Sequence, residues 1–480
     1  MASRSVAGAS AAQQQPPSAR RAATIIYLLL GLAILLGGHL RILAIEEMEV
    51  VAPVRADARD YVTYAHNLAV HGVYSRDGTL GGSETSAEGL SPDAVRAPGY
   101  PLVLTLFLDN PPTIHDIKQI KWFQAAIGVA TIGLAFLLAV GLMPKAWALV
   151  PTFLVAISSH LVSHTVYLLT ETLFTAVLMA FAVVIVHVER FRSAAVAGLI
   201  AGCLLGASAL IRPTTNYLVL AYLLAAFLPF VFYSRRLAVM MLLGFCIVFS
   251  PWTARNMATL GEPTSSHLKI NALHHGMYPG FMYEGDAATY GFPYKADPRS
   301  GEVSESVGTI LAEIGRRFQA EPWRHGRWFF VGKPLTLWQW GIINGAGDIY
   351  TYPVTESPYA KPGLASLTRA TMVALHWPTV ALALVVSVGV WLPAARRWLT
   401  RTELLAIRAI SLIILYYIAV HIVGAPFPRY SIPLRPIQYA LATWAAVFSW
   451  RVIAAYRRGP VEDAQPAQRD DAQPTVTRGA

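Results

Sequence analysis

Long apolar stretches without a single charge recur along the whole chain, and they constrain its fold more than any other feature. Ala22–Leu36 and Ala194–Ile211 are two examples. A helix needs about 20 apolar residues to cross the hydrocarbon core of a bilayer, whereas buried strands of soluble proteins have apolar runs of about 4–8 residues. Charged residues make up only 14% of the sequence, against about a quarter in soluble domains. The sequence therefore excludes a soluble fold and predicts an all-α polytopic membrane protein.

Lys and Arg residues cluster in the short segments between these stretches, as in Arg235-Arg236 and Arg396-Arg397. Such clusters are typical of cytoplasmic loops. Placing them on one side predicts about ten spans with both termini in the cytoplasm. The predicted spans are residues 23–45, 122–142, 147–163, 172–187, 194–211, 216–232, 238–251, 370–392, 409–423 and 437–450. The net charge of +10 follows from these loops, and no basic stripe with interleaved aromatic residues indicates nucleic-acid binding.

The remaining segments complete the predicted organisation. The tails 1–22 and 459–480 are polar, as in disordered segments. The first apolar run lacks a small-residue cleavage site, so we expect a retained helix rather than a signal peptide. The predicted parts between the tails are an N-terminal catalytic transmembrane module (23–251) with a first outside loop (46–118), an extracytoplasmic or interfacial region (252–368), and C-terminal transmembrane helices (369–458).

Three features lie outside this scheme of spans. Residues 98–108 are apolar but too short to span, which predicts a re-entrant or interfacial helix. Residues 316–340 mix Arg, Phe and Trp, which predicts an amphipathic helix at the headgroup level. Cys203 and Cys246 lie inside predicted spans without a CxxC partner. They are predicted to be small buried apolar residues rather than disulfide or metal ligands.

Several charged residues fall on the predicted outer side, at or near the ends of spans. Charges that face a bundle interior are costly there and indicate function. The forked donors of arginine match phosphate oxygens, a carboxylate can take a proton from a hydroxyl group as general base, and cations stabilise a departing phosphate. Asp57 with Arg96, Arg212 and Arg255 would supply both parts of such a site. The other candidates on this side are Glu171, Arg429 and Tyr430.

Each of these residues also has a purely structural interpretation. Asp57 in isolation is a solvated surface acid. Glu171 would stabilise the N-terminus of the helix it begins, where negative charge is favourable. Arg212 and Arg255 would snorkel at span ends.

Other polar residues near the candidates point to no specific chemistry. Asp60 and Asp77 are interpreted as ordinary surface acids. His160 and His164 precede Glu171, which raises the question of a metal ion, but their spacing matches no ligand motif. The sequence therefore predicts no metal site.

The order of these segments resembles the GT-C superfamily of polytopic glycosyltransferases. It is most similar to bacterial relatives of dolichyl-phosphate-mannose–protein mannosyltransferases and to lipid A aminoarabinose transferases. The segments that carry the resemblance are Asp57-Ala58 with Tyr61, Ala65 and Leu68; Arg96-Ala97-Pro98-Gly99-Tyr100-Pro101; Leu169-Thr170-Glu171-Thr172-Leu173-Phe174; Gly206 with Leu210-Ile211-Arg212-Pro213; Pro251-Trp252-Thr253-Ala254-Arg255-Asn256; and Pro428-Arg429-Tyr430-Ser431-Ile432-Pro433. Each string alone is unspecific, but together and in this order they cover nearly the whole chain.

The resemblance implies a GT-C fold with extracytoplasmic juxtamembrane helices, located in the plasma (inner) membrane. The donor would be a hexose or pentose on undecaprenyl or dolichyl phosphate, transferred on the extracytoplasmic side. Asp57 would be the catalytic base, and Arg96, Arg212 and Arg255 would bind the donor phosphate. The residues implied for the substrate pocket are Glu171, Tyr61, Tyr100, Arg429 and Tyr430.

The resemblance says less about cofactors and acceptors than about the donor. It implies no certain cofactor and leaves a divalent cation open. Some members carry an Asp-Glu pair where this chain has Asp57-Ala58, which weakens the transfer of a metal site or of protein mannosylation. The implied partners are membrane lipid and a lipid, glycan or protein acceptor, with lipid or cell-envelope glycan at least as well supported as protein.

One acid without a nucleophile partner favours a single displacement with inversion at the anomeric carbon, by analogy with inverting glycoside hydrolysis. Two alternatives stay open at this point. A secondary transporter or lipid flippase also places charges near helix ends, although the chain shows no matching halves of the kind transporters often have. A non-catalytic scaffold is disfavoured by the presence of both the acid and the arginines.

Overall fold

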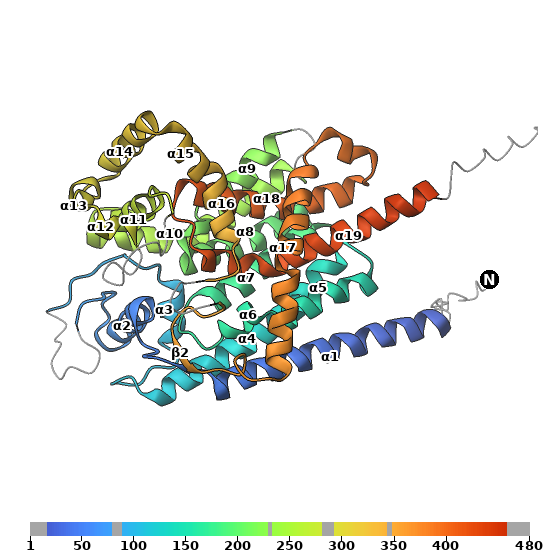
Figure 1. Cartoon of the computed structure of the whole chain (residues 1–480), viewed down its shortest axis with the longest axis horizontal. Helices are drawn as coiled ribbons and strands as arrows, with labels where there is room; N and C mark the ends of the chain where they lie inside the picture. The colour runs from blue at the N-terminus through green and yellow to red at the C-terminus, as the bar shows by residue number, and fades with distance from the viewer. Residues whose placement is uncertain (1–16, 79–88, 229–232, 281–291, 343–347, 458–480) are drawn as a thin grey trace, which may run out of the picture.

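The computed structural model describes residues 17–78, 89–228, 233–280, 292–342 and 348–457 (Figure 1). Within these residues, 6 helices are long and apolar enough to cross a membrane. They contain the segments Arg20–Glu47, Ile114–Val140, Ala194–Ile211, Arg235–Leu260, Leu364–Gly389 and Arg401–Val423. The prediction of an all-α polytopic membrane protein is confirmed.

A helix lies at each position predicted for a span. These helices are α1 (Pro17–Glu47), α4 (Ile114–Val140), α5 (Lys145–Ile157), α7 (Glu171–Val186), α8 (Ala194–Ile211), α9 (Leu218–Phe227), α10 (Arg235–Leu260), α17 (Leu364–Gly389), α18 (Arg401–Val423) and α19 (Arg435–Arg457). α5, α7 and the segment Pro213–Phe227 are apolar but shorter than the others. The end of the predicted span 216–232 and most of the two predicted tails lie outside the described residues.

α10 extends past the end predicted for it at residue 251. Pro251 lies inside the helix, which continues to Leu260. Membrane helices tolerate proline where neighbouring groups satisfy the freed backbone atoms. Arg255, predicted to follow this span, therefore lies on its last turns.

α8 and α10 pack closely because glycines face the contact. Gly198, Gly202 and Gly206 recur every fourth residue of α8, and a Cβ on Gly202 would lie 2.0 Å from the carbonyl oxygen of Met241. Small residues at this spacing let membrane helices approach backbone to backbone.

The two cysteines, which lie on α8 and α10, are not buried: Cys203 is partly exposed and Cys246 is exposed. The prediction of buried cysteines was wrong, because an apolar thiol can equally face lipid.

The segments between the long helices form short helices, most of them at one end of the molecule, at the left in Figure 1. These are α2 (Ala56–His71), α3 (Gly99–Leu104), α6 (Ser159–Ser163), α11 (Ser266–Gly276), α12 (Pro293–Ala296), α13 (Ser300–Val303), α14 (Val307–Ala320), α15 (Pro322–Arg327) and α16 (Lys333–Trp338). The start of α1 and the end of α19 lie at the opposite end. α3 lies within the short helix predicted for 98–108.

The predicted amphipathic helix 316–340 is not a single helix. α14 ends at Ala320, α15 starts at Pro322, and a π-helical turn, η4 (Trp328–Gly332), precedes α16. Proline lacks the N–H that would continue the helix and starts a new one instead. The amphipathic character predicted for this segment is thus divided among several short elements.

Two very short strands join distant parts of this end. β1 (Glu49–Val50) pairs antiparallel with β2 (Val354–Glu356), with Glu49 opposite Glu356. Strands this short have no hydrophobic periodicity, so they were not predicted. Between β1 and α2 the backbone takes positive φ at Ala52 and Ala56, 49° and 44°. Such angles cost a non-glycine residue of the order of 1 kcal/mol each, so the surrounding structure holds the start of α2 firmly.

Candidate active site

Asp57 lies in the first turn of α2, where the helix dipole favours a negative charge. Two arginines from distant parts of the chain bind its carboxylate. Arg96 Nη2 lies 2.6 Å from Oδ1 and Arg429 Nη2 lies 2.5 Å from Oδ2. Burial raises the pKa of the Asp57 carboxyl, but the guanidinium groups of Arg429 and Arg96 outweigh this and hold it well below its usual range. The sequence predicted Arg96 beside Asp57; it placed Arg429 only in the wider pocket.

Asp60 binds the other side of Arg96. Arg96 donates to Asp60 Oδ2 from Nε at 3.0 Å and from Nη2 at 2.8 Å. Asp57 and Asp60 are three residues apart on α2, so both project from one face of the helix. The interpretation of Asp60 as a solvated surface acid was wrong: its side chain is only 18% exposed. Its spacing from Asp57 at the start of a helix was the signal that pointed to a shared partner.

The chain around Arg96 is held in place from both sides. The Tyr74 hydroxyl donates to the carbonyl oxygen of Arg96 at 3.1 Å. After Pro98, α3 packs against the end of α8, where a Cβ on Gly99 would lie 2.8 Å from the carbonyl oxygen of Leu210. Only glycine permits this approach without a shift, so the Pro-Gly of this segment brings Arg96 toward the end of α8.

Arg429 lies on a 3₁₀ turn, η6 (Pro428–Leu434), that follows α18. The end of α18 is fixed by Lys333 of α16, whose buried ammonium group donates to the carbonyl oxygens of Ile422 at 2.7 Å and Gly424 at 3.0 Å. A cation at a helix C-terminus satisfies carbonyls that have no partner within the helix. This contact determines where the turn that carries Arg429 begins.

A second ion pair lies close to the first. Arg212, the residue that caps the C-terminus of α8, lies 3.0 Å from Oε1 of Glu171, the first residue of α7. The Glu171 side chain is 3% exposed and that of Arg212 is 10% exposed. The Arg212 guanidinium also lies 4.9 Å from the ring centre of Tyr430. Glu171 Oε2 has no hydrogen-bond partner among the described residues. Glu171 is therefore more than a helix-end acid: it carries half of a buried ion pair.

Tyr61 and Tyr100 connect the two ion pairs. Their rings meet edge to face with centres 5.2 Å apart, and the Arg96 guanidinium lies 5.6 Å from the ring centre of Tyr61. Burial raises the pKa of Tyr61 to about 12, and the charges of Arg96, Asp57, Glu171 and Arg212 all act on this hydroxyl. The structure thus places the predicted residues Tyr61, Tyr100 and Tyr430 among the charged groups.

Arg255, predicted to bind the donor phosphate, contacts the backbone of the first loop. Its guanidinium group donates to the carbonyl oxygens of Asp93 at 2.8 Å and Tyr74 at 3.2 Å, and to Asn256 Oδ1 at 3.1 Å. It also lies over the rings of Tyr74 and Trp252, 5.5 and 5.1 Å from their centres. Arg255 therefore holds the first loop at Tyr74 and at Asp93, three residues before Arg96.

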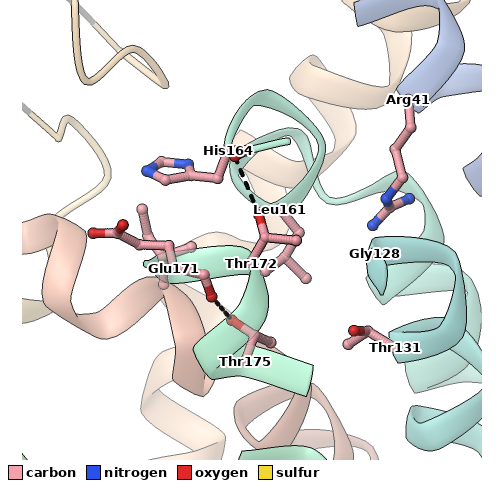
Figure 2. Close-up of a pocket in the computed structure, with 9 residues that line it drawn as sticks. Arg41, Gly128, Thr131, Leu161, His164, Glu171, Thr172 and Thr175 are labelled. Carbon is pink, nitrogen blue, oxygen red and sulfur yellow. Dashed lines mark hydrogen bonds between the residues drawn. The ribbon is translucent and has the colours of Figure 1, made fainter. Parts of the chain in front are cut away.

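A small cavity adjoins Glu171 on the bundle side (Figure 2). Its lining comprises Arg41, Gly128, Thr131, Leu161, His164, Glu171, Thr172, Thr175 and Ile432. Figure 2 shows Arg41 of α1 on the side opposite His164 and Glu171. Arg41 is 1% exposed, and a Cβ on Gly128 would lie 2.4 Å from its Nε. No sequence pattern points to Arg41, because a lone arginine near a span end has no partner at a recognisable spacing.

The residues present do not fit a divalent cation. Among the described residues there is no group of three or more His, Cys, Asp or Glu side chains that could hold a metal ion. Asp57 and Asp60 share the Arg96 guanidinium, and its positive charge occupies the place where a cation would bind. The two ring nitrogens of His164 bond to the His160 carbonyl oxygen at 2.7 Å and the Thr351 hydroxyl at 3.0 Å.

Neither a protein-family profile nor a curated protein matches this sequence. Solved structures do match. The oligosaccharyltransferase of Archaeoglobus fulgidus tethered with an acceptor peptide gives a TM-score of 0.49 at 15% identity, covering 90% of this chain and 50% of that chain. The same archaeon's AglB with an inhibitory peptide and a dolichol-phosphate gives 0.45 at 14%, covering 90% and 51%. ArnT from Cupriavidus metallidurans bound to undecaprenyl phosphate gives 0.40 at 11%, covering 90% and 79%.

The chain thus spans about half the length of the oligosaccharyltransferases that it matches. All of these TM-scores lie below 0.5 and the identities are at most 15%.

Proposed function

We propose that this protein is a membrane glycosyltransferase that moves a sugar from a polyprenyl-phosphate donor to a hydroxyl acceptor on the extracytoplasmic side of the plasma membrane. The observation that carries the proposal is the Arg96–Asp57–Arg429 cluster with the Glu171–Arg212 pair beside it. An acid and guanidinium groups from distant segments meet there.

In the proposed reaction, the acceptor oxygen attacks the anomeric carbon and its proton passes to the Asp57 carboxylate. The bond between the anomeric carbon and the phosphate oxygen breaks, and its electron pair stays on the polyprenyl phosphate. Arginines stabilise this growing negative charge, among them Arg96, which contacts Asp57, and Arg212, which contacts Glu171. One displacement inverts the anomeric centre, by analogy with inverting glycosidases.

The surrounding residues would shape the site. Glu171, Tyr61, Tyr100 and Tyr430 are the proposed pocket residues, since they contact the charged groups or lie within reach of their charges. The proposed acceptor is a lipid, glycolipid or cell-envelope glycan at least as much as a protein.

The proposal is tested with the purified full chain in lipid nanodiscs and a panel of synthetic undecaprenyl- and dolichyl-phosphate hexoses and pentoses, with an envelope lipid extract as acceptor. We expect free polyprenyl phosphate and an acceptor-linked sugar of inverted configuration, detected by mass spectrometry and NMR. Movement of the intact donor across a bilayer without cleavage would instead identify a flippase.

Arg255→Met is expected to loosen the first loop and thereby to reduce transfer by roughly 10- to 100-fold through misplacement of Arg96. The Asp93 amide donates to the Tyr74 carbonyl oxygen at 3.1 Å, and the Arg76 amide donates to Asp93 Oδ2 at 3.0 Å. Hydrogen exchange at these amides should accelerate in the variant. The matched control is Arg59→Gln, an exposed arginine of α2, which should leave exchange at these amides unchanged. Slower transfer with unaltered exchange would make Arg255 a direct substrate ligand instead of a positioning residue.

A further inference from the structure

The charges of the described site cancel one another. Three carboxylates, Asp57, Asp60 and Glu171, face three guanidinium groups, and the contacts between them are 2.5–3.0 Å long. The guanidinium groups are those of Arg96, Arg212 and Arg429. A phosphate that binds these guanidinium groups therefore competes with carboxylates that already contact them.

Asp57 is bound by two different arginines. One arginine binds each of its two oxygens. A carboxylate in charge-assisted contact with two guanidinium groups is stabilised in its ionised form and takes up a proton reluctantly. In this state Asp57 is a weak base for an acceptor hydroxyl, although it is the acid best placed to serve as one.

We propose that the Asp57 carboxylate and the donor phosphate compete for the guanidinium groups of Arg96 and Arg429, so that donor binding frees Asp57 to act as the base. Arg429 thereby becomes a ligand of the donor phosphate. This inference rests on the proposed function, since it names how the phosphate of the polyprenyl donor is bound. It also links the two substrates: the base becomes strong only when a donor is present, which disfavours proton uptake by Asp57 in the empty enzyme.

The two arginines are held differently, which gives the exchange a direction. Arg96 has a second acid, Asp60, that binds its Nε and Nη2, so Arg96 stays in place when it releases Asp57. The Arg429 guanidinium contacts Asp57, and its Nε has no hydrogen-bond partner among the described residues. Asp60 is thus a positioning residue for Arg96, while Arg429 is the arginine with an unused donor to offer to a phosphate.

The test is the affinity of the purified full chain for undecaprenyl phosphate, which carries the phosphate but no sugar to transfer. Removing the competing carboxylate in Asp57→Asn should tighten binding at least tenfold, whereas a carboxylate that plays no part in phosphate binding would leave the affinity unchanged. Arg429→Gln should weaken binding, because a phosphate ligand is lost. A thermal unfolding scan of each variant separates loss of affinity from loss of fold.

The matched control is Glu313→Gln. Glu313 of α14 is also a buried acid bound by arginines, namely Arg316 at 2.5 Å, Arg317 at 2.7 Å and Arg299 at 3.4 Å, so this substitution makes the same change in charge outside the site. Its affinity for undecaprenyl phosphate should equal that of the wild type. Unchanged or weaker binding by a folded Asp57→Asn variant would overturn the exchange, even if the wild type transfers sugar. If Asp57→Asn binds undecaprenyl phosphate more tightly but the wild-type protein transfers no sugar, the exchange is supported and the proposed transferase activity is overturned.

Discussion

Asp57→Asn should lower the rate of glycosyl transfer by roughly 10²- to 10⁴-fold, the usual contribution of a positioned general base. The amide keeps the size of the side chain, but it has only one oxygen with which to accept a hydrogen bond where the carboxylate offers one to each arginine, and it cannot take the proton of the acceptor hydroxyl. The measurement is the initial rate of polyprenyl phosphate release at saturating donor, compared with that of the wild type in the same nanodiscs.

The control for this variant is Asp109→Asn, which removes an exposed carboxylate from the same end of the molecule and should transfer at the wild-type rate. Turnover by Asp57→Asn within a few-fold of the wild type would remove Asp57 from the role of base. The acceptor proton would then have to pass to another group, and the arginines would form a phosphate-binding site with no identified base.

Arg212→Met should destabilise the protein by about 3–5 kcal/mol, because it leaves the buried carboxylate of Glu171 without its cation. The Glu171 side chain is only 3% exposed, so water cannot replace the guanidinium group. Arg429 already contacts Asp57 at 2.5 Å, so it would have to share its charge between two carboxylates if it replaced Arg212. The free energy of unfolding, measured by detergent titration in mixed micelles, should fall by this amount.

The double variant Glu171→Gln/Arg212→Met separates electrostatics from packing. Removing both charges should restore most of the lost stability, since replacing a buried ion pair by uncharged groups is often neutral, while transfer stays impaired. If the double variant is as unstable as Arg212→Met alone, the loss comes from packing against Phe174 and Tyr430, whose rings Arg212 covers, and not from the unpaired charge.

Much of the site could be located from local sequence. Glu171 begins α7 and Arg212 caps α8, as predicted, because both positions are set by where an apolar run starts or stops. Asp57 and Arg96 were predicted to meet, and they do. In each case the residues adjoin a helix end or a Pro-Gly segment, and short-range signals place such features well.

Other parts of the site depended on contacts between distant segments. Arg429 contacts Asp57 across a separation of 372 residues. Arg255 contacts the backbone of the first loop, and β1 pairs with β2, which lies in the region 252–368. Asp60 was misjudged because its exposure depends on the position of Arg96, a property of the packed loop rather than of α2. None of these contacts leaves a periodic or spacing signal in the chain.

The sequence by itself determined that this protein is a bundle of membrane helices, where the helices lie along the chain, and which charged residues stand at their ends. Hydrophobic burial in lipid imposes these features on every apolar run separately, so they can be recognised one segment at a time. Only the tertiary structure decided which acid is bound by which guanidinium group. These contacts join segments far apart in the chain, so it is the packing among α2, the loop that carries Arg96 and the turn after α18 that brings Arg96 to Asp57 and Asp60, and Arg429 to Asp57.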